Sequence, residues 1–291
     1  MRIIENRKKF FVASLCVIIL GLAAMVYHAS TGKGAFHYDV EFTGGTSMEI
    51  DMGTEYEQKD LEKILQEVTG QDTPQVQQVI GTNEVAIKLK SIDGETREKL
   101  MSEIQRIYPD AVMGEVSDVS GTVSREMQSA AIKATLIAGL AMLIYISIRF
   151  KDIRAGGSAI IALLHDVLIV LAAYAIFRIP VNTTFIVVLL TILGYSINAT
   201  IVIFDRIREN KTRFRPNQTA EKINKSISQT LARSINTSIT TLFTVGAIYF
   251  LGVQSIKEFA LPMMIGILAG AYSSICISGS VWYELLPKRD K

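Results

Sequence analysis

The chain has 291 residues, of which 49% are hydrophobic and 20% are charged, and its formal net charge is +2. This composition is too apolar for an ordinary soluble domain, although many charges remain. The charges are unevenly distributed: residues 28–128 hold 19 acidic and 9 basic side chains, whereas the remainder holds 9 acidic and 21 basic ones. We therefore expect one soluble acidic segment within a basic membrane protein.

Six apolar stretches are long enough to cross a hydrocarbon core of about 30 Å, which requires about 20 helical residues. They cover residues 10–27, 130–148, 155–177, 181–204, 234–251 and 259–286. The first stretch follows Arg7, Lys8 and Lys9 and so imitates a secretory signal, but about 18 uncharged residues suit a retained membrane anchor better. The sequence predicts a membrane all-α bundle of six helices, divided between residues 1–27 and residues 129–291.

Basic residues indicate how these helices are oriented. They gather before the first stretch, in the short loop near residue 150, after the fourth stretch and at the C-terminus, whereas the alternate short loops hold only Arg178 and Lys257. Lys and Arg accumulate on the cytoplasmic side of a membrane. We therefore expect both termini in the cytoplasm and residues 28–128 outside it.

Residues 28–128 have a mixed α and β pattern. Strands are predicted at residues 38–42 and 47–50, joined by a turn at Gly44 and Gly45 that uses the conformational freedom of glycine. Helical spacing follows over residues 56–68 and 95–108, residues 75–89 suggest a hairpin that turns at residues 81–83, and residues 112–119 suggest an extended segment. The order β-α-β-β-α-β favours an inserted α+β domain of the ferredoxin-like type, on the extracytoplasmic side.

The segment between the fourth and fifth membrane helices is amphipathic. Ile223, Ile227 and Leu231 are spaced at i, i+4 and i+8, which is typical of one face of a helix. An amphipathic helix can bury such a face at a membrane surface. We expect this segment to lie along the surface and to lead into the fifth membrane helix.

Four motifs occur in order along the chain. Residues 42–46 read FTGGT, residues 164–167 read LHDV, residues 194–210 read GYSINATIVIFDRIREN and residues 229–234 read QTLARS. Together they closely resemble the signature of the SecF family of bacterial protein-export membrane proteins, and the resemblance covers the whole chain. The residues that carry the first and third motifs are Gly44, Gly45, Thr46, Gly194, Asp205, Arg206, Arg208, Glu209 and Asn210.

The resemblance implies a transport subunit and not an enzyme. Members of this family pair with SecD, whose six helices complete a bundle of the resistance-nodulation-division (RND) type beside the SecYEG channel in the bacterial inner membrane. The ion-motive force then promotes late steps of preprotein export. We accordingly expect a SecD-like subunit, SecYEG, an unfolded preprotein and the lipid bilayer as partners, no nucleic acid, and no cofactor apart from transported H⁺ or Na⁺.

The third motif departs from the family pattern at one position. The residue after its asparagine is usually an aspartate thought to take part in proton movement, and here it is Ala199. A methyl group cannot carry a proton or a cation. Asn198 and Thr200 could offer neutral oxygens to an ion, or they could bridge neighbouring helices, as such residues commonly do in membranes.

Asp166 stands near the middle of the third predicted membrane helix. An ionised carboxylate there costs about 2.5–3.5 kcal/mol, so it should face the bundle interior or a wet cavity. It either switches protonation as the helices move or clamps two helices as a neutral acid. His165 is a candidate for proton relay, but it points about 100° away around the helix, so the two side chains should not face one partner.

Further candidates lie in the last three membrane helices. Arg233 matches a family arginine regarded as important for ion coupling, and it could also anchor its helix at the membrane surface. The charged residues of the third motif suggest a cap and ion-pair cluster at the end of the fourth helix. Gly266 and Gly270 form a small-residue face suited to close helix packing, within this bundle or against a partner.

Two other functions stay open. An RND-type exporter of small molecules or lipids shares the helix arrangement but normally carries two six-helix halves in one chain. A structural subunit without its own ion coupling agrees with Ala199. We find no catalytic or metal-binding motif, and Cys16 and Cys276 lie in apolar stretches, where a thiol usually packs as a small buried residue.

Overall fold

The computed structural model describes residues 2–71, 75–78, 82–150, 152–215, 217–252 and 254–287. Within these residues six helical segments are long and apolar enough to cross a membrane, which confirms the predicted six-helix membrane protein. They are α1 (Arg7–Ser30), α5 (Gly121–Phe150), α6 (Ile153–Phe177), α7 (Thr183–Glu209), α8 (Thr219–Leu251), and a last segment made of α9 (Gln254–Tyr272), η2 (Ser273–Ser278) and α10 (Gly279–Leu285).

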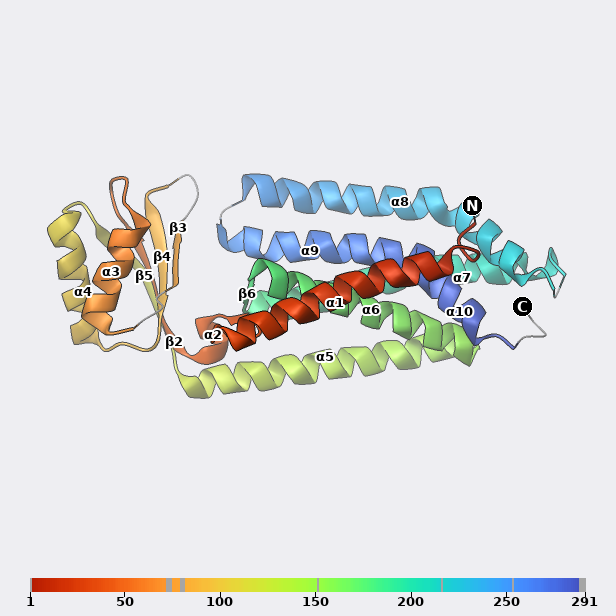
Figure 1. Ribbon diagram of the computed structural model, residues 1–291, viewed down its shortest axis with the longest axis horizontal. Coiled ribbons are helices and arrows are strands. Elements are labelled where there is room, and N and C mark those ends of the chain that lie inside the picture. The colour runs from red at the N-terminus through yellow and green to blue at the C-terminus, as the bar shows by residue number, and fades with distance from the viewer. Residues whose placement is uncertain are drawn as a thin grey trace.

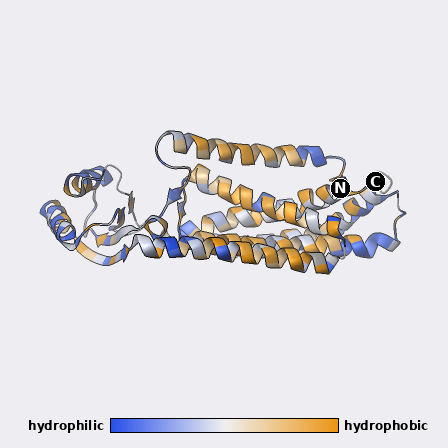
Figure 2. Cartoon of the chain, turned by 90° about the horizontal axis from the view of Figure 1, so that it is seen from below, coloured by the Kyte–Doolittle hydropathy of each residue, from blue (hydrophilic) through white to orange (hydrophobic). Residues whose placement is uncertain are grey.

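The helices form an elongated bundle with an α/β domain at one end, while α1 begins and α10 ends at the opposite end (Figure 1). Apolar residues predominate along the helices, and polar residues gather in the α/β domain and at the far end of the bundle (Figure 2). In the most apolar part of each helix, 50% of the residues are buried in α6 and 44% in α7, against 11% in α1 and 6% in α5. Cys16, which we expected to be buried, is exposed because α1 lies at the periphery.

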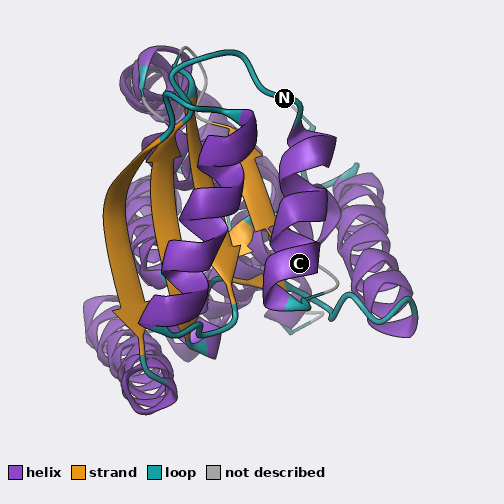
Figure 3. Ribbon diagram, turned by 90° about the vertical axis from the view of Figure 1, so that its left-hand side faces the viewer, coloured by secondary structure: helices purple, strands orange, loops and turns teal. Residues whose placement is uncertain are grey.

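The α/β domain contains β2 (Gly45–Asp51), α3 (Gln58–Thr69), β3 (Gln75–Gln78), β4 (Glu84–Leu89), α4 (Gly94–Ile107) and β5 (Val112–Val119). Its strands form an antiparallel sheet in the order β3-β4-β2-β5. α3 and α4 cover the sheet face that points away from the bundle (Figure 3). Met48, Ile50, Val85 and Ile87 fill the core under these helices. Of the predicted hairpin turn, Gly81 lies outside the described residues.

The structure differs from the prediction between residues 37 and 45. A short strand, β1 (His37–Tyr38), pairs in parallel with β6 (Pro180–Val181) in the connection between α6 and α7. Most of the predicted strand 38–42 is instead a helix, α2 (Val40–Thr43), because the Asp39 side chain caps it by accepting a hydrogen bond from the Val40 amide at 2.6 Å. The pairing of β1 with β6 and the cap at Asp39 therefore outweigh the strand-like sequence pattern of residues 38–42.

Gly44 and Gly45 connect α2 to β2 and do not form the predicted turn between two strands. Gly44 has a φ of +78° and Gly45 a φ of +153°. A Cβ on Gly45 would lie 2.3 Å from the backbone carbonyl oxygen of Leu89. The junction between helix and strand therefore requires glycine at this point.

The segment predicted to lie along the membrane surface is the first part of α8, which continues into the fifth membrane helix as predicted. Ile223 and Ile227 are 0% exposed and pack against α7 and the last membrane helix. The N-terminal segment joins them, because the Asn224 side-chain oxygen accepts hydrogen bonds from the Ile3 and Ile4 amides at 2.9 and 3.1 Å. The apolar stripe is thus buried within the protein, which spacing alone does not distinguish from burial in lipid.

Candidate functional site

A buried carboxylate lies at the centre of the helix bundle. Asp166 of α6 is 0% exposed. Its Oδ2 accepts hydrogen bonds from the hydroxyls of Ser196 in α7 and Ser273 in η2, at 2.5 and 2.8 Å, and its Oδ1 lies 2.9 Å from Nδ1 of His165. These four residues are termed the carboxylate cluster. In the part of the chain that the structure describes, no lysine or arginine pairs with Asp166.

His165 connects the carboxylate cluster to the first helix. Its Nε2 lies 2.9 Å from the Ser14 hydroxyl, and its ring stacks on Tyr272 with the centroids 6.0 Å apart. His165 and Asp166 have separate partners in α1 and α7, but both also contact the last membrane segment, at Tyr272 and Ser273. They also hydrogen-bond to each other, which the helical angle between them did not suggest. A neutral imidazole donates through one nitrogen and accepts through the other, so it can pass a proton between a carboxylate and a hydroxyl.

The last membrane helix is irregular where it meets this cluster. Residues Ser273–Ser278 form a π-helix, a distortion that is frequent at functional sites. Ser273 and the adjacent Ser274 both point into the bundle, and the Ser274 hydroxyl lies 2.9 Å from that of Thr200 and 3.3 Å from the Ser196 carbonyl oxygen. Thr200, which is 1% exposed, thereby joins the polar core beside Asp166.

Asn198 and Arg233 do not reach this core. Asn198 is exposed on the face of α7 opposite the buried Ser196, and Arg233 is exposed on α8. Ala199 is half-buried between these two faces. The structure thus brings Asp166, His165 and Thr200 together and leaves Asn198 and Arg233 outside. Among the described residues, no group of three His, Cys, Asp or Glu side chains could hold a metal ion.

The charged residues of the third motif connect the end of α7 to its neighbours. Asp205 pairs with Arg149 of α5, with Oδ2 and Nη2 2.5 Å apart, and its Oδ1 lies 4.0 Å from Arg208. Gly194, in contrast, is exposed on α7 in the middle of the membrane region. The acidic residue of this motif therefore holds α5 and α7 together at the end far from the α/β domain.

The remaining motif residues join α7 to α8. Arg206 pairs with Glu209 at 2.6 Å within the last turn of α7. Asn210 is 1% exposed and donates a hydrogen bond to the Ser226 hydroxyl of α8 at 2.8 Å. In the first motif, Thr46 is also buried and donates to Asp118 of β5 at 2.6 Å. The contacts of these motif residues fix helix and strand ends.

Gly266 and Gly270 allow α9 to approach α7. A Cβ on Gly266 would lie 2.0 Å from Cδ1 of Ile192, and a Cβ on Gly270 would lie 3.0 Å from Cβ of Ser196. Both contacts are internal to the bundle. Because Ser196 donates to Asp166, the close approach at Gly270 also sets the position of one partner of the carboxylate.

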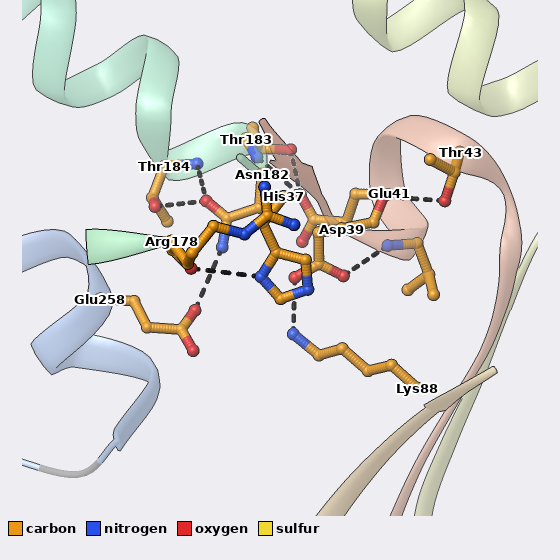
Figure 4. Close-up of polar contacts among 11 residues, drawn as sticks. His37, Asp39, Glu41, Thr43, Lys88, Arg178, Asn182, Thr183, Thr184 and Glu258 are labelled. Carbon is orange, nitrogen blue, oxygen red and sulfur yellow. Dashed lines mark hydrogen bonds and ion pairs between the residues drawn. The ribbon is translucent and has the colours of Figure 1, made fainter. Parts of the chain in front are cut away.

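A second polar cluster lies where the α/β domain meets the bundle (Figure 4). Asp39 is 3% exposed and, besides capping α2, pairs with the Lys88 ammonium of β4 at 2.5 Å. Glu41 of α2 accepts hydrogen bonds from the amide and hydroxyl of Thr183, at the start of α7, at 2.7 and 2.6 Å. We call this cluster the joint, because it connects the sheet to the bundle; its members are Asp39, Glu41, Lys88 and Thr183.

The connection between α6 and α7 reinforces the joint. The Asp39 amide donates to the Val181 carbonyl at 3.1 Å, and Nδ1 of His37 lies 3.2 Å from the Arg178 carbonyl. The Arg178 guanidinium donates to the carbonyls of Lys33 and Gly34, each at 2.9 Å, and partial burial lowers the pKa of this arginine. The chain that leaves α1 is therefore bound along its length to the same end of the bundle.

The joint was not predicted from the sequence. Asp39 could have been recognised as a helix N-cap, because it precedes Val40 and the short apolar segment of α2. Lys88 carries no such signal, since a polar residue alternating with buried ones in a strand usually faces solvent. The pairing of the two depends on how the domain is placed on the bundle.

The sequence is similar to that of known protein-export membrane proteins. Residues 99–288 match the family described as protein export membrane protein SecD/SecF, C-terminal. The protein translocase subunit SecF of Alicyclobacillus acidocaldarius is 34% identical over 96% of this chain and 91% of its own length. The SecF subunit of Haemophilus influenzae is 32% identical over 98% of this chain and 86% of its own length.

Solved structures give the same result. The crystal structure of SecDF, a translocon-associated membrane protein from Thermus thermophilus, matches 98% of this chain with a TM-score of 0.84 and 31% identity. This chain spans 38% of the length of that SecDF, and 37% of the SecDF of Bacillus subtilis, to which it is 32% identical. The resemblance noted from the four motifs is confirmed, and the chain belongs to the SecD/SecF family of protein-export membrane proteins.

Proposed function

We propose that this chain is the SecF-type subunit of a Sec translocase accessory complex in a bacterial inner membrane, with both termini in the cytoplasm. The observation that carries the proposal is the match to a SecF subunit, which extends over 96% of this chain and 91% of that relative. A SecD-like partner would supply a second set of six membrane helices. SecYEG and an unfolded preprotein would be the other partners, and the complex would promote late steps of export.

The exposed faces of α7 and α8 support a SecD-like partner within the membrane. Arg233, Thr237, Thr240 and Thr244 lie exposed along one face of α8, and Asn198 is exposed on the neighbouring α7. Arginine and asparagine side chains are costly against hydrocarbon. The threonine hydroxyls donate to carbonyls of α8 itself, so this face is composed of small side chains that allow another helix to pack closely. A second six-helix half packed on this face would complete an RND-type bundle.

Within this chain, the carboxylate cluster is the candidate for the response to an ion gradient. Asp166 would take up and release a proton while its partners reorient, because the hydroxyls of Ser196 and Ser273 can donate to a carboxylate or accept from a carboxylic acid. His165 would relay the proton toward Ser14. The buried position of all these groups supports a response that follows movement of the helices.

The α/β domain would carry that response to the preprotein. Its sheet order β3-β4-β2-β5 and its two helices on one face support a ferredoxin-like fold in the extracytoplasmic segment 28–128. The joint ties this domain to Thr183 at the start of α7, and the same helix carries Ser196. A displacement of α7 at Asp166 would therefore reach the domain.

A structural subunit without ion coupling is the second candidate. Ala199 stands where the family usually has an aspartate, and the neighbouring Asn198 faces away from the carboxylate cluster. In that case the SecD-like partner would conduct all the ions. The carboxylate cluster would then act only as a clamp between α6, α7 and η2.

Reconstitution distinguishes these functions. The chain is co-purified with its SecD-like partner, both are reconstituted with SecYEG, and late translocation of a preprotein is measured under a proton or a sodium gradient. We expect one gradient to accelerate translocation and Asp166→Asn to remove the acceleration, while Asp110→Asn, at an exposed acid of the α/β domain, retains it. Acceleration that survives Asp166→Asn would favour the structural role.

Two further outcomes of this experiment separate the parts of the proposal. Arg233→Ala should reduce co-purification with the SecD-like partner, whereas Lys257→Ala, away from the proposed interface, should not. If the complex stimulates translocation equally without any gradient, coupling fails but the export function stands. If the chain neither binds the partner nor stimulates translocation, the export function itself is contradicted.

A further inference from the structure

A cavity of about 320 Å³ lies at the end of the bundle far from the α/β domain. Its wall includes Arg208 at the end of α7, Lys211 in the following turn (Asn210–Thr212), Lys222 in α8, Asp152 before α6 and Trp282 in α10. Elements distant in sequence therefore bring their charged ends to one place. A cavity of this size can hold a small polar group together with part of an apolar one.

The charges around this cavity do not balance. Three cations, Arg208, Lys211 and Lys222, face one carboxylate, that of Asp152. Both oxygens of this carboxylate are already engaged: Oδ1 accepts from the Arg154 amide at 3.0 Å and Oδ2 from the Trp282 indole at 3.2 Å. The cavity thus has a positive excess, while its own acid is used to fix α6 and α10.

The cations lack other strong partners in the described parts of the chain. Lys211 and Lys222 form no ion pair there, and Arg208 has only Asp205 at 4.0 Å, an acid that Arg149 also holds. Lys222 is half-buried, and its ammonium lies 5.6 Å from the centre of the Trp282 ring. A half-buried ammonium over an aromatic face, with a second lysine nearby, is an arrangement that an anion would stabilise.

The position of the cavity selects the kind of anion. Its apolar wall is formed by Ala155, Phe204 and Ile207, and Trp282 lies at the end of the last membrane helix. Tryptophan is enriched where membrane helices meet the headgroup region, and basic pockets between helices at this level bind anionic lipid headgroups. A free inorganic anion would use the cations but leave the apolar wall without a partner.

We propose that this cavity binds the headgroup phosphate of an anionic phospholipid, with the adjoining glycerol and first acyl carbons against its apolar wall. The site depends on membrane insertion of the six helices and is independent of the proposed ion coupling. Bound there, the lipid would contact α6, α7, α8 and α10 together. It would neutralise the positive excess at the point where these helices converge.

The test uses Trp282, which is the single tryptophan of the chain, as the reporter. The full chain in neutral detergent micelles is titrated with short-chain phosphatidylglycerol, short-chain phosphatidylcholine or inorganic phosphate, while the emission of Trp282 is followed. We expect a saturable change with phosphatidylglycerol at a midpoint at least about tenfold below that of phosphatidylcholine. Native mass spectrometry of the same samples should show one retained phosphatidylglycerol.

Three variants test the assignment to this cavity. Lys211→Gln and Lys222→Gln should each raise the phosphatidylglycerol midpoint about fivefold, the effect expected for one cation near a lipid phosphate. Lys225→Gln, at an exposed lysine of the same helix that does not line the cavity, should leave the midpoint unchanged. Lys211 is exposed, so its variant remains informative if Lys222→Gln disturbs the fold.

Other results would overturn the proposal. Equal midpoints for phosphatidylglycerol and phosphatidylcholine would show that the headgroup charge is not recognised. An equal response to inorganic phosphate would assign the cavity to a free anion instead of a lipid. If Lys225→Gln loses as much affinity as Lys211→Gln, phosphatidylglycerol is attracted by the overall positive charge of this surface and not by the cavity.

Discussion

Asp166 and Asp39 are both buried carboxylates, at 0% and 3% exposure, but they have different partners. Asp39 faces the Lys88 ammonium at 2.5 Å and caps α2, whereas Asp166 meets two hydroxyls and the imidazole of His165. An ammonium favours only the ionised carboxylate, while a hydroxyl can serve either form. The joint is therefore suited to one charge state, and the carboxylate cluster is suited to two.

The two clusters also share one helix. Thr183 of the joint begins α7, and Ser196 of the carboxylate cluster lies 13 residues later in the same helix. An α-helix rises 1.5 Å per residue, so the two points are about 20 Å apart along its axis. In the proposed function, α7 would connect the fixed attachment at the joint to the carboxylate cluster in its middle, and a change at Asp166 would reach the α/β domain through this helix.

The largest loss of stability should come from Lys88→Met in the joint. It leaves Asp39 buried without its counter-charge, which should lower the free energy of unfolding by about 3 kcal/mol. Thermal unfolding of the full chain in detergent measures this change. Lys90→Met, at an exposed lysine directly after β4, is the control. The double variant Asp39→Asn with Lys88→Met should recover part of the loss. Equal stability of both lysine variants would show that the ion pair does not hold the joint.

A smaller loss is expected when Ser196 is displaced from Asp166. Gly270→Ala places a Cβ 3.0 Å from Cβ of Ser196, so α7 and α9 must separate slightly. Overpacking of this kind costs about 1–3 kcal/mol. Gly139→Ala on α5 meets nothing within 4 Å and should gain up to about 1 kcal/mol from helix propensity. Unchanged stability and unchanged gradient response in Gly270→Ala would contradict the role given to this contact.

Ser14→Ala tests the connection between His165 and α1. It removes the hydroxyl that lies 2.9 Å from Nε2 of His165, so a buried ring nitrogen loses its partner at a cost of about 1 kcal/mol. Ser30→Ala in the same helix removes only an exposed hydroxyl that donates to the Tyr27 carbonyl. If His165 relays protons to α1, the gradient response should fall in Ser14→Ala and not in Ser30→Ala. Equal gradient responses in the two variants would show that no proton passes from His165 to Ser14.

The sequence predicted those features that depend on local pattern. The six apolar helices followed from length and hydropathy, and the interior position of Asp166 followed from the cost of a charge in hydrocarbon. Asp39 was misassigned to a strand because its local N-cap signal was overlooked, whereas its pairing with Lys88, 49 residues away, arises only in the folded chain. The contact of Ser273 with Asp166 joins residues 107 positions apart and lies at the start of a π-helix, which the helical spacing did not predict.

The smallest effect on stability should come from Asp166→Asn, and the same substitution at Asp39 provides its comparison. At position 166 the new amide can accept from Ser196 and Ser273 and donate to His165, so the free energy of unfolding should change by less than about 1 kcal/mol. Asp39→Asn keeps the helix cap but leaves the half-buried Lys88 without a counter-charge, and it should cost more than about 2 kcal/mol. Both are read by thermal unfolding in detergent and by the gradient response after reconstitution. If Asp166→Asn is stable but lacks the gradient response, and Asp39→Asn is unstable, then Asp166 is a switching carboxylate and Asp39 is a structural one. Equal losses of stability in the two variants would instead show that Asp166 is a second structural clamp.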